Sequence, residues 1–287
     1  MIQTPQTSAN AHLRAVGDAP DVQAGPRDVL LRLEGVGKSY GAASSAIVAL
    51  QAVDLDIRRG EFMTVIGPSG CGKSTLLQIA SGLITPSAGR VLLNEKPISG
   101  PPPEIVYLFQ QYTKSLFPWR NVRDNVAFGL ERKALRRAER TERAAAYLEM
   151  VGLADFASHY PWQLSGGMQQ RVAIARALAA TPRMLLMDEP FSAVDALTRL
   201  DLQALVLDIW QKSGDLTILF VTHDVEEAVY LSDRIAVLTR RPASISRVVE
   251  PGLKRPRHPV DTREDAVFLR HRHDLLNTLV NRPNGNS

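Results

Sequence analysis

The 287-residue sequence lacks several features that would place it in particular classes of protein. Its single cysteine, Cys71, excludes an internal disulfide and fits a reducing compartment. No apolar run reaches the roughly 18 to 20 residues that a membrane-spanning helix needs. The best candidates, "EFMTVIG" and "LTILFVTHD", have the length of strands, and no internal repeat is visible. We therefore expect any role at a membrane to depend on a partner.

The first 27 residues lack a basic segment followed by an apolar block, so we expect no signal peptide. They are rich in Gln, Thr, Ala, Pro and Asp, and we predict that 1–27 is a disordered tail. The net charge of +4 and the pI near 9.3 suit an acidic ligand or a membrane surface without selecting either. An apolar content of 45% predicts a sizeable core.

Hydrophobic patterning predicts an α/β fold. Alternating apolar and polar residues from Val29 to Gly60, divided by "GAASSA", predict antiparallel strands with a loop. "EFMTVIG" predicts a buried strand that runs into a glycine loop and a helix. Helical patterns follow from about residue 121 to 180, and strands return at "RMLLMD", "LTILFVTHD" and "RIAVLTR" around a helix near 197–212. Helices between strands favour parallel pairing. From Arg241 we predict a loop and then a short helix near 266–279.

The strongest motif is "GPSGCGKS", which fits G-x-x-x-x-G-K-[ST] between a predicted strand and a predicted helix. In such a loop, backbone N–H groups and the helix N-terminus bind phosphates. Lys73 is expected to reach the β- and γ-phosphates, and the Ser74 hydroxyl to ligate Mg²⁺. The predicted nucleotide-binding residues here are Gly67, Pro68, Ser69, Gly70, Cys71, Gly72, Lys73, Ser74 and Thr75.

A second candidate half of the site is "RMLLMDEP", an apolar strand with Asp188 and Glu189 at its carboxyl end. Asp188 is suited to Mg²⁺, which prefers oxygen ligands, and Glu189 to orienting or deprotonating water. Taken alone, its last four residues, "MDEP", fit a solvated acidic turn better than a metal site, and the presence of the phosphate loop reverses that preference. The two motifs together still fit a kinase, a GTPase or a motor.

The segment "LSGGMQQR" separates these classes. Followed by "MDEP", "SAVD" and "VTHD", in that order after "GPSGCGKST", it resembles the ATPase subunit of ATP-binding cassette (ABC) transporters. The resemblance runs from about Val29 to Arg240. It implies a P-loop NTPase core of the RecA-like type, with an antiparallel β subdomain and a helical signature subdomain. The implied ABC domain is 28–245, with its core at 28–110 and 181–245 and the Q-loop and helical subdomain at about 111–180. A short extension follows at 246–287.

The resemblance also assigns roles. Gln110 is similar to the family's Q-loop glutamine, and Tyr40 to the aromatic residue that stacks on adenine. His223 resembles the switch histidine beside the catalytic Glu189. The implied catalytic set is Glu189, His223, Gln110 and Lys73, and the implied metal ligands are Ser74, Gln110 and Asp188.

The remaining implied contacts belong to "LSGGMQQR", which resembles the family's signature, and to "SAVD", which resembles its D-loop. Ser165 is predicted to cap a helix, so that its hydroxyl and the N–H groups near Gly166 and Gly167 form an anion site. In the family this site faces the γ-phosphate held by a second subunit, and Asp195 resembles the D-loop aspartate that helps to build that opposite site. The resemblance thus implies two ATP molecules in a head-to-tail dimer.

The transporter subtype is indicated by "YTKSLFPWRNVRDNVAFGL", which resembles bacterial importers of nitrate, aliphatic sulfonates and taurine. Phe117 and Trp119 suit a groove for a membrane subunit, and ordinary packing explains either residue equally well. The implied partners are permease subunits and, indirectly, a periplasmic solute-binding protein, at the cytoplasmic face of the inner membrane. Two alternatives are a soluble ABC ATPase acting on nucleic acid or ribosomes and a small-molecule kinase.

We assign no function to three other features of the sequence. "ERKALRRAERTER" interleaves acids with bases and has no aromatic residue, so a solvated helix face is favoured over a nucleic-acid patch. His258, His271 and His273 lack metal-site spacing. The helix N-terminus and Lys73 can lower the pKa of Cys71, but we interpret Cys71 as a small loop residue that has no catalytic task.

Overall fold

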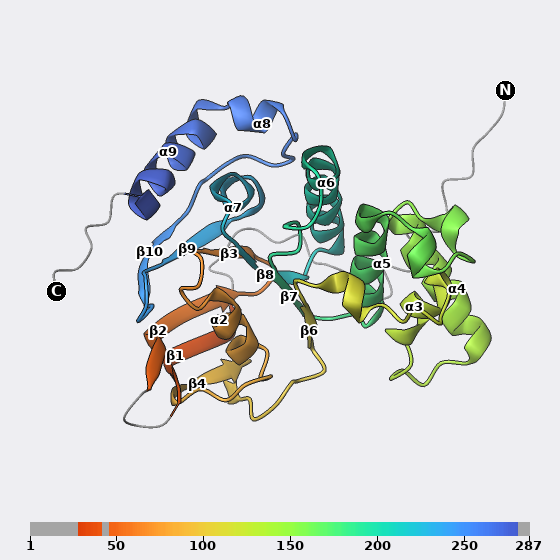
Figure 1. Cartoon of the computed structure of the whole chain (residues 1–287), viewed down its shortest axis with the longest axis horizontal. Coiled ribbons are helices and arrows are strands. Elements are labelled where there is room, and N and C mark those ends of the chain that lie inside the picture. Colours follow the sequence, from red (N-terminus) through yellow and green to blue (C-terminus); the bar gives the residue numbers. More distant parts are fainter. Residues whose placement is uncertain (1–27, 42–45, 281–287) are drawn as a thin grey trace.

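The computed structural model of the chain describes residues 28–41 and 46–280. The predicted tail 1–27 and most of the "GAASSA" loop lie outside these residues. The described part contains two β-sheets, a group of helices on one side, and a C-terminal helical segment that lies across the larger sheet (Figure 1). Within it, no helix combines the length and apolar character needed to cross a bilayer.

The smaller sheet is antiparallel, as the alternating pattern predicts. Its strand order is β2-β1-β4-β5, and β1 pairs with both β2 and β4 in antiparallel register. The strands span Val29–Tyr40 (β1), Ile47–Arg58 (β2), Ala88–Leu93 (β4) and Lys96–Pro97 (β5).

The larger sheet has the order β10-β9-β3-β8-β7-β6. Five neighbouring strands run parallel, and β10 joins the edge antiparallel to β9. The strands span Phe62–Ile66 (β3), Ile105–Leu108 (β6), Met184–Asp188 (β7), Thr217–Thr222 (β8), Arg234–Leu238 (β9) and Ile245–Val249 (β10). Because parallel strands share their direction, the segments that follow β3, β6, β7 and β8 meet at one edge, where ligands of such sheets collect.

Strand β10 corrects the prediction of a loop from Arg241 onward. It pairs with β9, and the hairpin closes with a hydrogen bond from the Thr239 N–H to the Ser244 carbonyl, 3.0 Å. Its side chains alternate between half-buried and exposed, which is the pattern of an edge strand. Such a short strand with no fully buried residue carries a weak hydrophobic signal, so its pairing is decided by the neighbouring strand.

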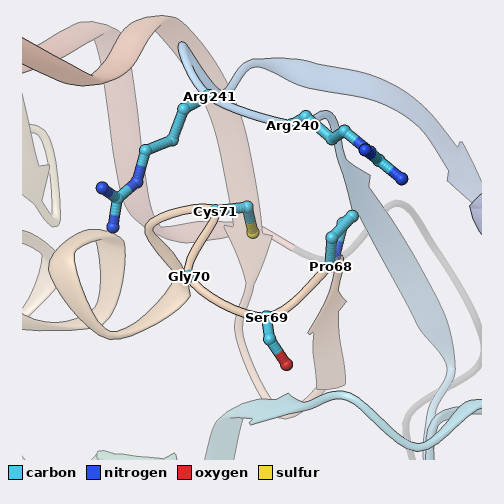
Figure 2. A pocket seen from close by; sticks show the side chains of 6 residues that line it. All are labelled: Pro68, Ser69, Gly70, Cys71, Arg240 and Arg241. Atoms are coloured by element: carbon cyan, nitrogen blue, oxygen red, sulfur yellow. The ribbon is translucent and has the colours of Figure 1, made fainter. Parts of the chain in front are cut away.

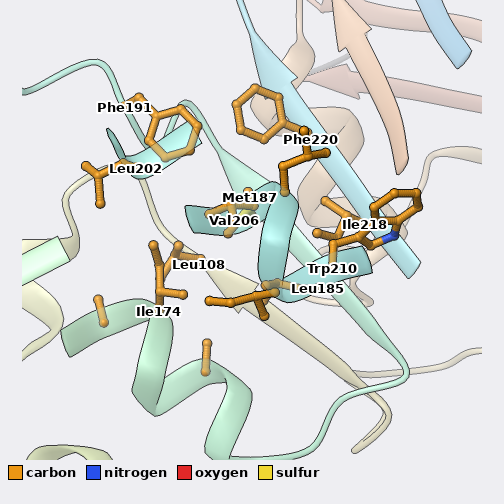
Figure 3. Packing of buried hydrophobic residues seen from close by; sticks show 14 of the residues in the cluster. Leu108, Ile174, Leu185, Met187, Phe191, Leu202, Val206, Trp210, Ile218 and Phe220 are labelled. Carbon is orange, nitrogen blue, oxygen red and sulfur yellow. The ribbon is translucent and has the colours of Figure 1, made fainter. Parts of the chain in front are cut away.

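The central strands are buried on both faces and divide the core in two. Phe62 and Ile66 of β3 pack with the helices α5, α6 and α7, whereas Met63 and Val65 pack with α2 and the smaller sheet. Strands β7 and β8 alternate in the same way, and Figure 3 shows Leu185, Met187, Ile218 and Phe220 among residues of α5 and α6. Burial on both faces explains why these strands are continuously apolar in sequence.

Several helices begin at residues whose side chains cap them. Helix α2 (Lys73–Ala80) follows the glycine loop, and α3 (Val122–Phe128), α4 (Arg137–Met150) and α5 (Gly166–Ala179) form the lateral group. Side chains of Asn121, Ser165, Asp195 and Asp224 cap α3, α5, α6 (Ala196–Ser213) and α7 (Val225–Leu231) by accepting backbone N–H groups. Single 3₁₀ turns occupy Tyr112–Ser115, Ala154–Phe156 and Pro161–Gln163. The C-terminal segment contains α8 (Asp261–Glu264) and α9 (Ala266–Val280).

Candidate nucleotide site

The loop between β3 and α2 has the backbone conformation of a phosphate cradle. Gly72, at the N-cap of α2, has φ of 119°, a value that residues with a Cβ rarely adopt. A Cβ on Gly67 would lie 3.0 Å from both the Sγ of Cys71 and the Cβ of Leu238. The loop can therefore turn tightly over the end of β3 and present N–H groups at the helix N-terminus.

Lys73 is held against this loop. Its side chain is 5% exposed, and its Nζ donates to the carbonyl oxygens of Gly67 (2.9 Å) and Pro68 (3.1 Å). The same ammonium lies 3.9 Å from a carboxylate oxygen of Glu189. A buried cation thus stands between the loop and the carboxylate at the end of β7, where it can contact phosphate.

Asp188 is the last residue of β7 and is 5% exposed. Ser74 Oγ donates to one of its oxygens (3.0 Å), and the hydroxyl of Tyr107 in β6 donates to the other (2.9 Å). Burial raises the pKa of Asp188, and the two hydrogen bonds oppose that rise because they favour the ionised carboxylate. Tyr107 is not among the residues predicted from the sequence, because its short apolar strand gives no sign of this contact.

Glu189 brings together residues that are far apart in sequence. Gln110 Nε2 donates to its Oε2 at 3.3 Å, and His223 Nδ1 lies 3.1 Å from the same oxygen. Because a carboxylate only accepts hydrogen bonds, that ring nitrogen carries the proton when Glu189 is ionised. Glu189 has φ of 44°, unusual for a residue with a Cβ, and its N–H donates to Val221 at 2.9 Å. All four predicted catalytic side chains therefore meet at the carboxyl edge of the sheet.

Tyr40 lies at the end of β1, beside the first turn of α2. Its ring is 44% exposed, its hydroxyl is 3.4 Å from the Thr75 Oγ1, and the Lys38 Nζ lies 5.3 Å from the ring centre. An accessible aromatic face next to the phosphate loop is suited to stacking on a flat base.

The signature residues lie apart from this group. Ser165 accepts the Met168 N–H at 3.3 Å and caps α5, which belongs to the lateral helices in Figure 1. A Cβ on Gly167 would lie 2.4 Å from the Thr198 Cγ2, so α5 closely approaches the first turn of α6, which Asp195 caps. Among the described residues, no hydrogen bond or ion pair joins Ser165, Gly167 or Asp195 to the phosphate loop.

Two arginines that the sequence reasoning missed line a hollow of about 630 Å³ on the outside of the phosphate loop. Arg240 and Arg241 follow β9 and flank Ser69 and Cys71, with their side chains directed away from each other (Figure 2). Burial raises the pKa of Cys71 despite the opposing charge of Lys73. Lys73 and the backbone N–H groups of the loop do lower that pKa, as predicted, but desolvation of the thiolate is the larger effect and the net change is upward.

A glycine loop after a central parallel strand, with an Asp-Glu pair at the end of a nearby strand, places the chain among the P-loop nucleoside triphosphatases. The family model described as "ABC transporter" matches residues 50–192. An ABC transporter ATP-binding protein of Methanocaldococcus jannaschii, named as uncharacterized, is 51% identical over 251 residues, or 88% of this chain and 91% of the relative.

Two further comparisons indicate the same family. The nitrate import ATP-binding protein NrtD of Synechococcus elongatus is 42% identical over 255 residues, covering 88% of this chain and 92% of NrtD. A dimeric ATP-binding cassette solved with ADP and Pi superposes with a TM-score of 0.67 at 36% identity, covering 77% of this chain and 98% of that one. The chain belongs to the ATP-binding proteins of ABC transporters, which bind and hydrolyse ATP to drive transport.

Proposed function

We propose that this chain is the ATP-hydrolysing subunit of a bacterial importer for nitrate, a sulfonate, taurine or a similar small solute. Two relatives named for nitrate support nitrate as a member of this solute class: NrtD and the nitrate transport protein NasD of Klebsiella oxytoca, which is 42% identical over 254 residues. The observation that carries the ATPase mechanism is the convergence of Lys73, Gln110 and His223 on Glu189.

In this mechanism Glu189 is the general base. It accepts a proton from the water that attacks the γ-phosphorus, while Gln110 and His223 hold its carboxylate by hydrogen bonds of 3.3 and 3.1 Å. Lys73 and the loop from Gly67 to Thr75 bind the phosphates, and Tyr40 stacks on the adenine. The charge on the phosphoryl group is thereby stabilised by donors that are already in place.

The residues around Asp188 fit Mg²⁺. A buried carboxylate beside a serine hydroxyl is a set of hard oxygen donors, and the Ser74 Oγ and Asp188 lie 3.0 Å apart. We propose Ser74, Asp188 and Gln110 as the residues that hold the ion, directly or through water. When bound, the ion neutralises charge on the phosphates.

We further propose a head-to-tail homodimer. Ser165, Gly166 and Gly167 offer a capped helix N-terminus, and within the described part of the chain no hydrogen bond or ion pair joins them to their own phosphate loop. A second copy that brings this helix end to the γ-phosphate explains why the segment needs no lysine. Dimeric cassettes among the solved relatives support this arrangement.

Exposed aromatic residues support docking of a permease. Trp119 is 72% exposed and lies 5.5 Å from Phe117, whose ring packs edge-on at 4.8 Å against the half-exposed Phe128. Arg120 lies over Phe117 at 5.1 Å. An apolar patch rimmed by a cation is typical of a protein interface. This contact would hold the chain at the cytoplasmic face of the inner membrane, with a periplasmic solute-binding protein acting through the permease.

Coexpression with the permease subunits tests the proposal. We expect the complex to copurify from membranes, and Trp119→Ala to reduce that recovery. Trp162→Ala is the matched control, because Trp162 is 70% exposed but lies beside the signature. Deletion of the gene should reduce uptake of nitrate, a sulfonate or taurine by the host. Unchanged uptake of all three, with no copurifying membrane protein, would overturn the assignment.

A further inference from the structure

A buried chain of polar side chains connects the C-terminal segment to the residue before His223. The guanidinium of Arg263 in α8 donates to the Gln203 side-chain oxygen at 2.6 Å. Gln203 in α6 donates through its Nε2 to Glu227 in α7 at 3.1 Å, and the Thr222 hydroxyl donates to the other oxygen of Glu227 at 2.6 Å. The chain therefore joins three helices to the end of β8.

This series of hydrogen bonds ends at the backbone on either side of His223. The Thr222 Oγ1 donates to Glu227 and also accepts the Asp224 N–H at 3.0 Å. The side chain of Asp224 in turn accepts the N–H groups of Glu226 (2.8 Å) and Glu227 (3.3 Å). The residues on both sides of His223 are thus tied to Glu227, so a shift of Glu227 moves the peptide units that orient the imidazole.

The direction of each hydrogen bond is determined by chemistry. A guanidinium only donates and a carboxylate only accepts, so the Gln203 amide has one possible orientation between Arg263 and Glu227. Gln203 is 1% exposed and Glu227 is 5% exposed. Burial raises the pKa of Glu227, while the Thr222 hydroxyl favours its charged form. Loss of one link therefore leaves a buried polar group without its partner, which costs far more than the same loss at the surface.

Arg263 is itself held in place. Its guanidinium lies 4.1 Å from the centre of the fully buried Tyr230 ring and also donates to the Pro259 carbonyl. Helix α9 is anchored separately, because Phe268 and Leu275 are fully buried in the main core. The C-terminal segment can therefore stay folded without Arg263, and its guanidinium faces the chain that leads to His223.

We propose that Arg263 is a positioning residue for ATP hydrolysis, acting through Gln203, Glu227 and Thr222 to hold His223 against Glu189. This inference rests on the proposed role of His223. It gives the C-terminal segment a role in ATP turnover, because a change in the position of α8 would alter the hydrogen bonds that orient the His223 imidazole. Since none of these hydrogen-bonded side chains contacts Lys73 or Tyr40, ATP binding should be unchanged.

The test is steady-state hydrolysis by the full-length chain with Mg-ATP. We expect Arg263→Met to lower kcat about three- to tenfold, with the KM for ATP within about twofold, because geometry rather than binding is lost. Arg263→Lys keeps a donor and should recover most of the rate. Arg272→Met is the matched control: it removes a partly exposed pair with Glu226 at 3.0 Å from the same segment, and its kcat should stay at the wild-type value.

Combining Arg263→Met with His223→Ala distinguishes an effect on the position of His223 from a general effect on the stability of the protein. In a His223→Ala protein, Arg263→Met should cause no further loss of kcat, since the histidine that it orients is gone. Gln203→Leu should reproduce the loss and serves if Arg263→Met does not fold. A wild-type kcat for both Arg263→Met and Gln203→Leu, or an equal loss in the His223→Ala background, would overturn the inference. A wild-type rate for His223→Ala alone would instead refute the proposed role of His223, and this inference with it.

Discussion

Glu189→Gln is the substitution that tests the site most directly. The Glu189 Oε2 accepts from Gln110 and His223, and its Oε1 lies 3.9 Å from the Lys73 Nζ. An amide oxygen in the Oε2 position keeps both acceptor bonds, so the geometry of the site should survive. The change removes the ability to accept a proton at neutral pH, together with one negative charge near the phosphates.

The size of the effect follows from these contacts. A positioned general base contributes about 10²- to 10⁴-fold to rate, or about 2.7 to 5.5 kcal/mol of barrier. We therefore expect kcat to fall at least about 100-fold. The ATP dissociation constant should stay the same or decrease, because Lys73 loses a competing anion and keeps its bonds to Gly67 and Pro68.

The assay has two parts: phosphate release at saturating Mg-ATP, and size-exclusion chromatography with and without ATP. The variant should accumulate as a nucleotide-bound dimer while hydrolysis nearly stops. Glu142→Gln is the control, since it makes the same chemical change at an exposed position of α4. Hydrolysis by Glu189→Gln at the wild-type rate would refute the role of Glu189 as the base.

Three other substitutions make separate predictions. Lys73→Ala should weaken ATP binding at least about tenfold in calorimetry, because its phosphate contacts form in the ground state as well as in the transition state; an unchanged affinity would contradict its role. Ser165→Arg should leave ATP binding to the monomer intact and abolish ATP-dependent dimerisation in sedimentation velocity, whereas loss of monomer binding would place the signature within its own site. Tyr107→Phe removes a bond that lowers the pKa of Asp188, so the acidic limb of the pH–rate profile should move to higher pH. The Mg²⁺ requirement at about pH 6 should also rise several-fold, since the protonated carboxyl cannot ligate the ion. An unchanged profile would mean that Tyr107 does not tune Asp188.

Sequence patterns predict those parts of the fold whose causes are local. The strand, loop and helix around Gly67 are contiguous, and the glycine positions reflect a backbone need that no distant residue can change. The strands β3, β7 and β8 are recognisable because burial on both faces makes them continuously apolar. Strand β10 is missed for the opposite reason, since an edge strand with half-exposed side chains depends on its neighbour.

The phosphate loop, the Asp-Glu pair and the capped signature helix are predictable from the chain alone, because each is a short segment with its own chemistry. Which distant side chains meet depends on how the strands and helices pack. The contacts of Glu189 with Gln110 and His223 span 79 and 34 residues, and that of Tyr107 with Asp188 spans 81. The bond from Arg263 to Gln203 spans 60 residues and leaves no periodic trace in the sequence. Parallel strands bring such positions to one edge, and packing of the helices on the sheet selects the remaining contacts.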